Sequence, residues 1–272
     1  AAVFQINIMV SRGLALYVSD AAASLLYYAN RLVELPVGVF AIAISTVIFP
    51  SLSQAAAGKR MESFAATYKR GIIFCSLMAV PSAVGLAMLA PEIISLLFER
   101  GRFTRDDTFA GAPLVVVFAL GMPFYSFVTV ETRAFFALKD TRTPVRSAAV
   151  AFAVNAILSL ALMNRYGALG LAVASNVAAV VQAALLHLAL RSKKLNTGLK
   201  PLIPDALRIL LASIAMGGLV ALCQAYLAPA LPQTTAGAAA SLFGTIFAGA
   251  GGYFLALQVL GMKWRSLGRR RS

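Results

Sequence analysis

The sequence predicts an all-α, polytopic helical membrane protein with eight transmembrane helices. Of its 272 residues, 60% are hydrophobic and only 12% are charged, and the mean hydropathy is +0.82. A soluble domain is about 45–50% apolar and about 25% charged, so this chain has more apolar surface than one soluble core can bury. The apolar runs extend along the whole length, and helices satisfy their own backbone hydrogen bonds within a bilayer.

Eight apolar segments alternate with short polar gaps, and each reaches the length of a transmembrane helix, about 17 residues or more. The predicted helices cover residues 2–18, 24–53, 71–97, 109–138, 144–163, 169–190, 205–227 and 236–260. The chain opens inside an apolar helix without an initiator methionine, so we expect that the N-terminal part of a longer protein precedes it. Residues 191–204 form a linker that is basic and broken by Pro201 and Pro204.

The second predicted helix, residues 24–53, is longer than a bilayer requires. At 1.5 Å per residue it exceeds about 40 Å, so it must tilt or bend. Pro36 lacks the N–H that would bond the carbonyl of Leu32, and Gly38 follows shortly after it. We therefore expect a hinge at Pro36 and Gly38.

Basic residues fall unevenly on the two sides of the predicted spans. Seventeen of the 24 Lys and Arg residues lie in one set of gaps and in the C-terminal tail, four lie in the opposite gaps, and three lie within spans. Because cytoplasmic loops carry the excess of positive charge, both ends of the chain are predicted to be cytoplasmic. The net charge of +14 then reflects topology and contact with anionic lipid headgroups, and we expect no nucleic-acid partner.

Two oppositely charged side chains, Arg31 and Glu34, lie inside the second predicted helix. A charge in lipid costs about 2.5–3.5 kcal/mol on insertion scales, so each needs a reason to be there. Spacing alone leaves two interpretations open: an intrahelical ion pair that lowers the insertion cost, or a guanidinium that faces a cavity and binds an anion while Glu34 holds it in place. The adjacent proline and a second intramembrane arginine, Arg12, favour the cavity.

Other polar residues inside the spans suggest two weaker candidate sites. Oxygen-bearing side chains on several helices could line a cation site, although ordinary interhelical hydrogen bonds explain them better. These candidate cation ligands are Ser11, Asn155, Ser159 and Ser175. At the predicted cytoplasmic end of the fourth helix, a second group would form an ion-pair cluster or serve as an inner gate. Its members are Glu131, Arg133 and Asp140.

No arrangement in the sequence supports catalysis. It has no Ser-His-Asp set, no cluster with metal-ligand spacing and no glycine-rich phosphate loop, so we expect a transporter without a catalytic site, metal or cofactor. The single histidine, His187, is predicted to be a helix-end or packing residue. The alternative from another class is a structural membrane protein in which Arg31 and Glu34 form a packing pair.

Four segments of the chain are distinctive together: YYANRLVELPVGVFAIAISTVIFPSLS (27–53), LFERGRFT (97–104), RAFFALKDTRTPV (133–145) and YGALGLAVASN (166–176). They resemble the MurJ/MviN family of lipid II flippases, within the multidrug/oligosaccharidyl-lipid/polysaccharide exporter superfamily. The segments occur in the family's order, and the resemblance covers essentially the whole chain.

The resemblance implies the C-terminal portion of a two-lobed protein: the second six-helix lobe (1–190), a basic cytoplasmic linker (191–204), and two extra helices with a basic cytoplasmic tail (205–272). Such proteins move lipid II, the undecaprenyl-pyrophosphate-linked peptidoglycan precursor, across the bacterial cytoplasmic (inner) membrane by alternating access. The implied partners are lipid II, membrane lipids and the missing N-terminal lobe. The alternative is an exporter of another polyprenyl-linked glycan, or of a drug, in the same superfamily.

The resemblance also implies roles for single residues. Arg31 matches the family's essential cavity arginine and Glu34 the neighbouring acid, so Arg31 would bind the pyrophosphate and Glu34 would orient it. The implied substrate-binding set is Arg12, Asn30, Arg31 and Glu34. Asn30 departs from the Asp of many members. Ser11 and Ser159 stand where some members carry the acids of a sodium site, which weakens the expectation of sodium coupling.

Overall fold

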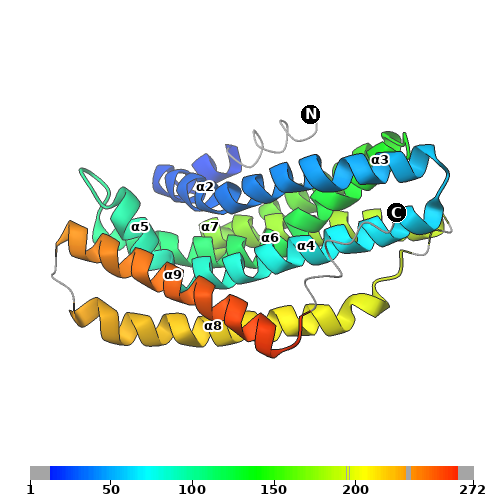
Figure 1. Cartoon of the computed structure of the whole chain (residues 1–272). Coiled ribbons are helices and arrows are strands. Elements are labelled where there is room, and N and C mark those ends of the chain that lie inside the picture. The colour runs from blue at the N-terminus through cyan, green and yellow to red at the C-terminus, as the bar shows by residue number, and fades with distance from the viewer. Residues whose placement is uncertain (1–12, 194, 196, 231–233, 263–272) are drawn as a thin grey trace.

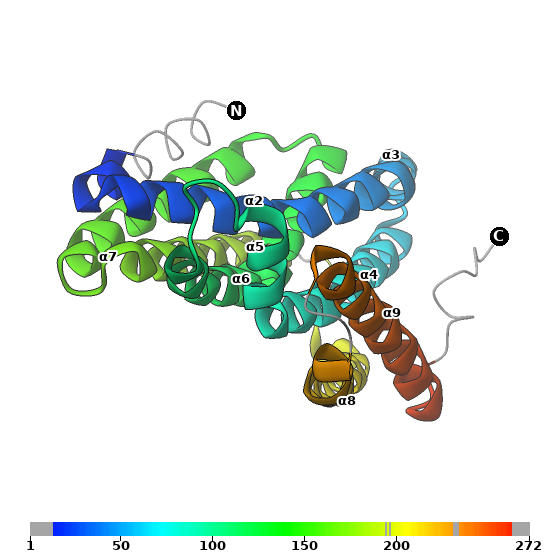
Figure 2. The same cartoon turned by 90° about the vertical axis from the view of Figure 1, so that its left-hand side faces the viewer.

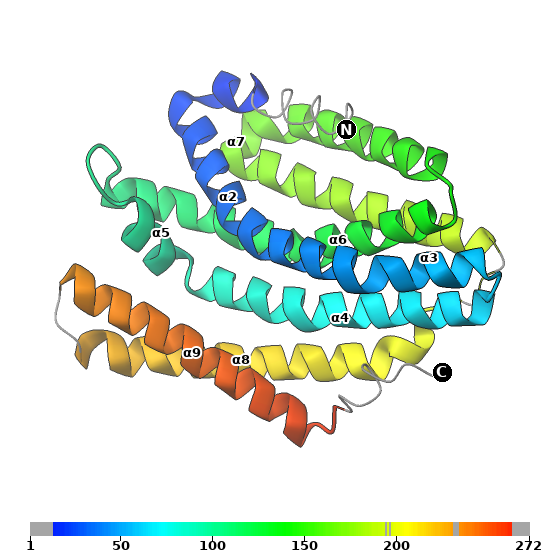
Figure 3. The ribbon, with the colours of Figure 1, turned by 45° about the horizontal axis from the view of Figure 1, so that its top comes forward.

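The computed structural model describes residues 13–193, 195, 197–230 and 234–262, and within them every regular element is helical. The elements in chain order are α2 (Asp20–Ala43), the π turn η1 (Ile44–Ile48), α3 (Phe49–Ala57), α4 (Met61–Met88), α5 (Ala90–Phe98), α6 (Arg105–Ala137), α7 (Arg142–Ser192), the 3-10 turn η2 (Lys200–Leu202), α8 (Ile203–Ala230) and α9 (Thr235–Val259). α4 and α6 lie at the centre, with α2 and α7 on one side and α8 and α9 on the other (Figure 1, Figure 3). The predicted all-α class is confirmed.

α2, η1 and α3 form one continuous helical run in the place of the long helix predicted at 24–53. The run begins earlier, because Ser19 Oγ accepts a hydrogen bond from the Ala22 N–H (3.0 Å) and caps the first turn. Pro36 lies inside α2 with helix on both sides, and the departure from α geometry comes later, at the π turn η1. The irregular turn of this run therefore lies next to α3 rather than at the proline.

The third predicted helix, residues 71–97, is divided into α4 and α5. Leu89 (φ −100°, ψ 13°) leaves the helical region between them, just before Pro91. Proline cannot continue the hydrogen-bond ladder of α4, whereas it fits the first turn of a new helix. Pro81, by contrast, stays inside α4. A single uninterrupted helix at this position was therefore the wrong prediction.

The fifth and sixth predicted helices, 144–163 and 169–190, form two arms of α7. Gly167 (φ 54°, ψ −131°) turns the chain between the arms, in a conformation that glycine adopts without strain. The chain doubles back so closely that a Cβ on Gly170 would lie 2.7 Å from the Leu162 carbonyl oxygen. The two arms run antiparallel, side by side (Figure 2, Figure 3). The prediction of two separate helices is confirmed.

Six helices in the described part of the chain are long and apolar enough to cross a membrane. They include α7 as one run of 51 residues, which if straight would measure about 77 Å, more than twice a hydrocarbon core. Because Gly167 divides α7 into two spans, the described part of the chain has seven candidate spans. The eighth predicted span, 2–18, lies mostly outside the described residues. The chain is a multi-pass helical membrane protein.

The connections between helices gather at two ends of the bundle (Figure 3). One end, called the basic end below, carries the α3–α4 turn (58–60), the α6–α7 turn (138–141) and the described residues that follow α7 (193, 195 and 197–199). The opposite end carries the 99–104 loop and the turn at Gly167. The basic end corresponds to the side that the sequence predicts to be cytoplasmic.

Three apolar clusters hold the helices together. The first joins α2, α4, α5 and α6, with Leu114 fully buried at its centre. The second lies at the basic end, where Phe64 and Phe135 are fully buried between α4 and α6. The third attaches α8 and α9 to α4, and within it the Tyr253 hydroxyl donates to the Leu77 carbonyl (2.9 Å). The last two helices are thus fastened to the bundle through α4.

Candidate functional site

The arginine that the sequence singles out lies on an uncovered face of α2. Arg31 Nη1 donates to Glu34 Oε2 (2.8 Å), and Asn30 Nδ2 donates to Glu34 Oε1 (2.7 Å). The Arg31 guanidinium also lies over the Tyr27 ring, with 5.2 Å between Cζ and the ring centroid. Three of the four predicted substrate-binding residues are therefore in mutual contact, and Glu34 and Tyr27 hold the guanidinium against α2.

Arg31 remains open to a ligand in spite of these contacts. Its side chain is 57% exposed and that of Glu34 is 45% exposed, although both lie within a membrane span. A guanidinium carries five N–H donors, so the bond through Nη1 leaves others for an anion. Bidentate, charge-assisted contacts of this kind suit phosphate and carboxylate groups. The intrahelical pair and the accessible guanidinium thus coexist in one arrangement.

The uncovered face of α2 continues beyond Arg31 as apolar side chains. Leu35, Val39 and Ile42 are 69%, 64% and 67% exposed. Their spacing of three or four residues places them along one side of the helix with Arg31. These four residues form a stripe, called the α2 stripe below, that is charged toward the start of the helix and apolar toward η1.

Two further predictions concern α2 and its surroundings. Pro36 lies inside the helix, and a Cβ placed on Gly38 would meet nothing within 4 Å. The space beside Gly38 is therefore open, α2 is continuous through Pro36, and the hinge stays a prediction. Arg12, the second predicted intramembrane arginine of the site, lies outside the described residues.

Three of the four predicted cation ligands meet between the arms of α7. Asn155 Oδ1 lies 3.4 Å from Ser159 Oγ and 3.5 Å from Ser175 Oγ, and both contacts are within hydrogen-bonding reach. Asn155 and Ser159 are buried, at 3% and 2% exposure, and Ser11 lies outside the described residues. Among the residues described, no three His, Cys, Asp or Glu side chains lie close enough to hold a metal. The cation site stays a prediction: Asn155 and Ser159 lie one turn apart on the same arm, and the contact of Asn155 with Ser175 matches hydrogen bonding between helices.

The three charges predicted as an ion-pair cluster or gate take separate partners. Glu131 and Arg133 point to different sides of α6, because two residues advance a helix by about 200°. Arg133 lies over the Phe49 ring, with 5.8 Å between Cζ and the centroid. Asp140 Oδ2 lies 2.9 Å from Lys193 Nζ, a partner too distant in sequence to be foreseen. A gate role for the three residues stays a prediction.

Asp140 also shapes the turn between α6 and α7. Its Oδ1 accepts a hydrogen bond from the Thr143 N–H (3.0 Å), and its Oδ2 accepts one from Thr143 Oγ1 (2.8 Å). The backbone bond from Thr143, together with the Lys193 ammonium, stabilises the carboxylate and lowers the pKa of Asp140 to about 2. The turn is thereby fastened to the end of α7 by a charge.

Glu131 has buried partners that the sequence analysis missed. The Tyr68 hydroxyl donates to Glu131 Oε1 (3.0 Å) and lies 3.0 Å from His187 Nδ1. His187, predicted to be a helix-end or packing residue, lies in the last turns of α7 with its side chain 18% exposed. Glu131 and His187 lie within predicted spans, whereas Tyr68 precedes the helix predicted at 71–97, so no signal in the sequence brings the three together.

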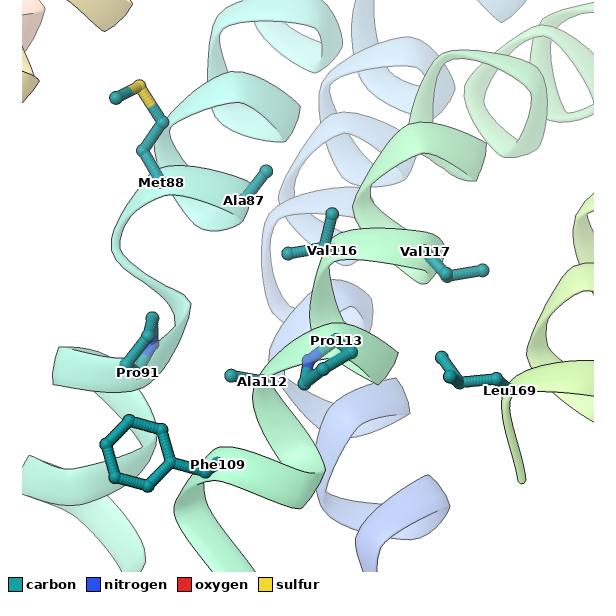
Figure 4. A pocket seen from close by; sticks show the side chains of 9 residues that line it. All are labelled: Ala87, Met88, Pro91, Phe109, Ala112, Pro113, Val116, Val117 and Leu169. Atoms are coloured by element: carbon teal, nitrogen blue, oxygen red, sulfur yellow. The ribbon is translucent and has the colours of Figure 1, made fainter. Parts of the chain in front are cut away.

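An open apolar groove of about 540 Å³ lies toward the end opposite the basic end, where α4 breaks before α5 (Figure 4). Its walls come from α4, α5, α6 and the second arm of α7, and they include Met88, Phe109 and Leu169. All the lining side chains are apolar, so the groove suits hydrocarbon rather than a charged headgroup.

Comparison with known proteins decides the family. The profile of the lipid II flippase MurJ family matches residues 1–235. The chain belongs to the MurJ family. Among its curated relatives, the probable lipid II flippase MurJ of Vibrio cholerae is 30% identical over 265 residues, which is 97% of this chain and 50% of that protein. The probable lipid II flippase MurJ of Rhizobium meliloti is 36% identical over 182 residues, 67% of this chain and 34% of that protein. The chain spans half or less of the length of these MurJ relatives.

Two solved structures resemble this one. The structure described as lipid II flippase MurJ in an inward closed conformation matches with a TM-score of 0.78 and 27% identity, over 98% of this chain and 52% of that chain. A MOP superfamily transporter from Pyrococcus furiosus matches with a TM-score of 0.53 and 14% identity, over 94% of this chain and 65% of that chain. The second likeness concerns the fold alone.

The segments that carry the MurJ resemblance occupy defined places in the structure. LFERGRFT ends α5 and forms the loop before α6, whereas RAFFALKDTRTPV forms the turn between α6 and α7. YGALGLAVASN begins at the Gly167 turn and enters the second arm of α7. YYANRLVELP contains the Arg31 site on α2. The resemblance stated from the sequence is confirmed.

Proposed function

We propose that this chain is the C-terminal part of a flippase that moves lipid II from the inner to the outer leaflet of the bacterial cytoplasmic membrane by alternating access. The observation that carries the proposal is the open guanidinium of Arg31 within a membrane span of a MurJ-family chain. A charge at such a position needs a partner or a ligand. The pyrophosphate of a polyprenyl-linked precursor is a ligand that matches the arginine fork.

Arg31 contacts the pyrophosphate in this proposal, and Glu34 orients it. Glu34 bonds both Arg31 and Asn30, so the direction of the guanidinium is set before a ligand arrives. Arg12, on the preceding predicted helix, supplies a second positive charge to the same anion. The α2 stripe gives the headgroup site an apolar continuation along the helix.

The proposed flippase has a second lobe outside this chain, and the α2 stripe faces it. In this proposal residues 1–190 belong to the second six-helix lobe, 191–204 to the linker, and 205–272 to a two-helix extension whose described helices pack on α4. The separate apolar cluster between α4, α8 and α9 supports this division. Alternating access requires two lobes that part on one side and then on the other, with Pro36 and Gly38 as the hinge of α2.

The proposed location is the cytoplasmic membrane, with both ends of the chain in the cytoplasm. The excess of Lys and Arg at the basic end supports this orientation, and the same residues would contact anionic lipid headgroups. The protein is proposed to be a transporter without a catalytic site and without a nucleic-acid partner.

The second candidate is the export of another polyprenyl-linked glycan, or of a drug, in the same superfamily. The fold likeness to the Pyrococcus furiosus transporter supports that superfamily. A cationic drug requires an acid that is free to bind it, whereas Glu34 already accepts bonds from Arg31 and Asn30. The site on α2 therefore favours an anionic headgroup.

Arg31→Ala in the full-length protein is expected to lower lipid II transport on the order of 10–100-fold, because a charge-assisted bond contributes roughly 1.5–3 kcal/mol. The measurements are growth of a strain depleted of its native flippase and the amount of lipid II exposed at the outer leaflet. Arg165→Ala is the matched control, since Arg165 is exposed and lies over the Tyr166 ring (5.6 Å), as Arg31 lies over Tyr27. Normal growth of the Arg31→Ala strain at a normal protein level would contradict the proposal.

Exchange of the two charges distinguishes transport from a structural role. A packing pair should tolerate Arg31→Glu combined with Glu34→Arg, because the intrahelical attraction is kept. An anion site should not, because a carboxylate at position 31 repels the anion, while the guanidinium moves about 4.5 Å along the helix and about 60° around it. Full lipid II transport by the exchanged protein would support the structural alternative.

A further inference from the structure

Tyr68, Glu131 and His187 come from three helices and meet near the basic end. Tyr68 follows the start of α4, while Glu131 and His187 precede the ends of α6 and α7. At 1.5 Å per residue, each lies roughly 8–11 Å from its helix end, so the three form one layer inside the bundle. These residues, called the Tyr68 cluster below, are not part of the Arg31 site.

The hydroxyl of Tyr68 connects the other two side chains of the Tyr68 cluster. The Tyr68 hydroxyl donates to Glu131 Oε1 (3.0 Å), so its oxygen can accept from His187 Nδ1, 3.0 Å away, in the tautomer or imidazolium that carries a proton on Nδ1. His187 Nδ1 also lies 3.5 Å from Glu131 Oε1. The bonds therefore connect a partly exposed imidazole, through a hydroxyl, to a carboxyl group whose side chain is 3% exposed.

Glu131 is not fully satisfied by these bonds. Its second oxygen, Oε2, is buried and meets no hydrogen-bond donor among the residues described. A buried carboxylate with an unbonded oxygen is costly, whereas a protonated carboxyl group places far less charge there. The geometry therefore favours an arrangement in which the cluster holds a proton.

The surroundings of the cluster supply no compensating charge that the structure describes. η1 and α3 contribute the apolar side chains of Ile44, Ile48 and Leu52, and α4 adds the thiol of Cys75. Nearby basic residues have other partners: Arg133, on α6, lies over the Phe49 ring, and Lys193, just after α7, pairs with Asp140. The remaining bases of this region flank the layer at partly or fully exposed positions, namely Lys69, Arg70 and Arg191.

We propose that the Tyr68 cluster is a proton-binding site, with His187 as its entrance and Glu131 as its buried acceptor. In the transfer, the His187 Nδ1–H bond breaks as Tyr68 Oη takes that proton, and the original Tyr68 hydroxyl proton passes to Glu131 Oε1. An imidazolium and a carboxylate thereby become an imidazole and a carboxylic acid. The cluster is electrically neutral before and after the step, as its apolar surroundings require.

Loss of the proton would leave one net negative charge among α4, α6 and α7. That charge is stable only if water reaches it, and water reaches it if the second arm of α7 separates from α4 and α6. Proton release is thus linked to opening of the basic end. This link rests on the proposed function and makes protons the coupling ion, whereas the site itself does not depend on that function.

Infrared difference spectroscopy of the full-length protein in lipid, between about pH 5 and pH 9, tests the site. We expect a carbonyl stretch of a protonated carboxylic acid that appears on acidification and disappears in Glu131→Gln. Glu62→Gln, an exposed carboxylate on α4, is the matched control and should keep the band. Tyr68→Phe should keep the band and move its midpoint on the order of one pH unit, because one hydrogen bond to the charged form is lost.

Equal difference spectra for the wild type and Glu131→Gln would overturn the site. If Glu131→Gln fails to fold, Glu131→Asp serves in its place, since it keeps the carboxyl group and should shift the band without removing it. A band that stays unchanged in both Glu131→Asp and Tyr68→Phe would equally contradict the assignment.

Lipid II transport in liposomes, measured across the same pH range, tests the link to the cycle. The wild type should change its rate with pH, and Glu131→Gln should show a flattened profile because an amide cannot release the proton. A Glu131→Gln profile that matches the wild type would overturn the link. A wild type that moves no lipid II would contradict the proposed function, and the carboxyl band would still decide the proton site.

Discussion

Asp140 shows how one side chain connects a turn to a distant helix end. It bonds the Thr143 backbone and hydroxyl within the α6–α7 turn, and it pairs with Lys193 at the end of α7. All of these contacts favour the ionised carboxylate, which lowers the pKa of Asp140 to about 2 from an ordinary value near 3.9. The stabilisation is therefore complete above about pH 4 and disappears as the pH falls through about 2.

Asp140→Asn should lower the thermal unfolding temperature of the full-length protein at neutral pH. The expected loss is about 1 kcal/mol or less, because Lys193 is partly exposed and solvent screens the pair. The difference between wild type and variant should shrink between about pH 4 and pH 2, where the wild-type carboxylate itself takes up a proton. Thermal unfolding in detergent at several pH values measures it. Glu62→Gln, at an exposed position on α4, should show no such convergence, and a difference that stays constant with pH would contradict the assignment to Asp140.

At the scale of elements, α6 and the second arm of α7 approach closely at Gly121. A Cβ on Gly121 would lie 2.1 Å from Asn176 Oδ1, a distance no real contact permits. Asn176 is held between the helices, because its Oδ1 accepts from the Tyr125 hydroxyl (2.8 Å) and its Nδ2 donates to the Val117 carbonyl. The absent side chain of Gly121 thus makes room for a polar contact that joins two spans.

Gly121→Ala should therefore destabilise the bundle by about 1–3 kcal/mol, because Asn176 must move and leave partly buried polar groups unpaired. The unfolding temperature of the purified protein is the measurement. Gly218→Ala on α8 is the matched control, since a Cβ there meets nothing within 4 Å, and it should cause no loss. Equal effects of the two substitutions would show that helix propensity, rather than the approach of α6 to α7, determines the outcome.

At the scale of the whole molecule, the sequence predicted which segments span the membrane better than how those segments contact one another. Lipid requires every span to satisfy its own backbone bonds, so hydropathy and length locate the helices, and the two arms of α7 were separated correctly. Hydropathy does not show the rotation of a helix, because lipid-facing and buried residues are both apolar. Leu120 is 64% exposed and Met122 is fully buried, yet the two look alike in sequence.

Contacts within one helix could be predicted from the sequence, whereas contacts between helices could not. Asn30, Arg31 and Glu34 lie within one helical turn, so their contacts follow from spacing. The partners of Glu131 come from other helices, and no spacing rule brings Tyr68 or His187 to it. The break at Leu89 likewise depends on which of two prolines in the segment meets a helix end.

The orientation of the molecule leads to a last prediction, which concerns both ends of the bundle together. The basic end is predicted to be cytoplasmic, so Thr141→Cys, in the exposed α6–α7 turn, should react with a membrane-impermeant maleimide only after cells are permeabilised. Arg102→Cys, in the exposed loop at the opposite end, should react in intact cells. Cys75 and Cys223 are buried and should give little background. The reverse labelling pattern would place the basic end outside and contradict the charge rule for this chain. It would also reverse the predicted position of Arg31, which lies nearer the opposite end and therefore in the outer half of the membrane.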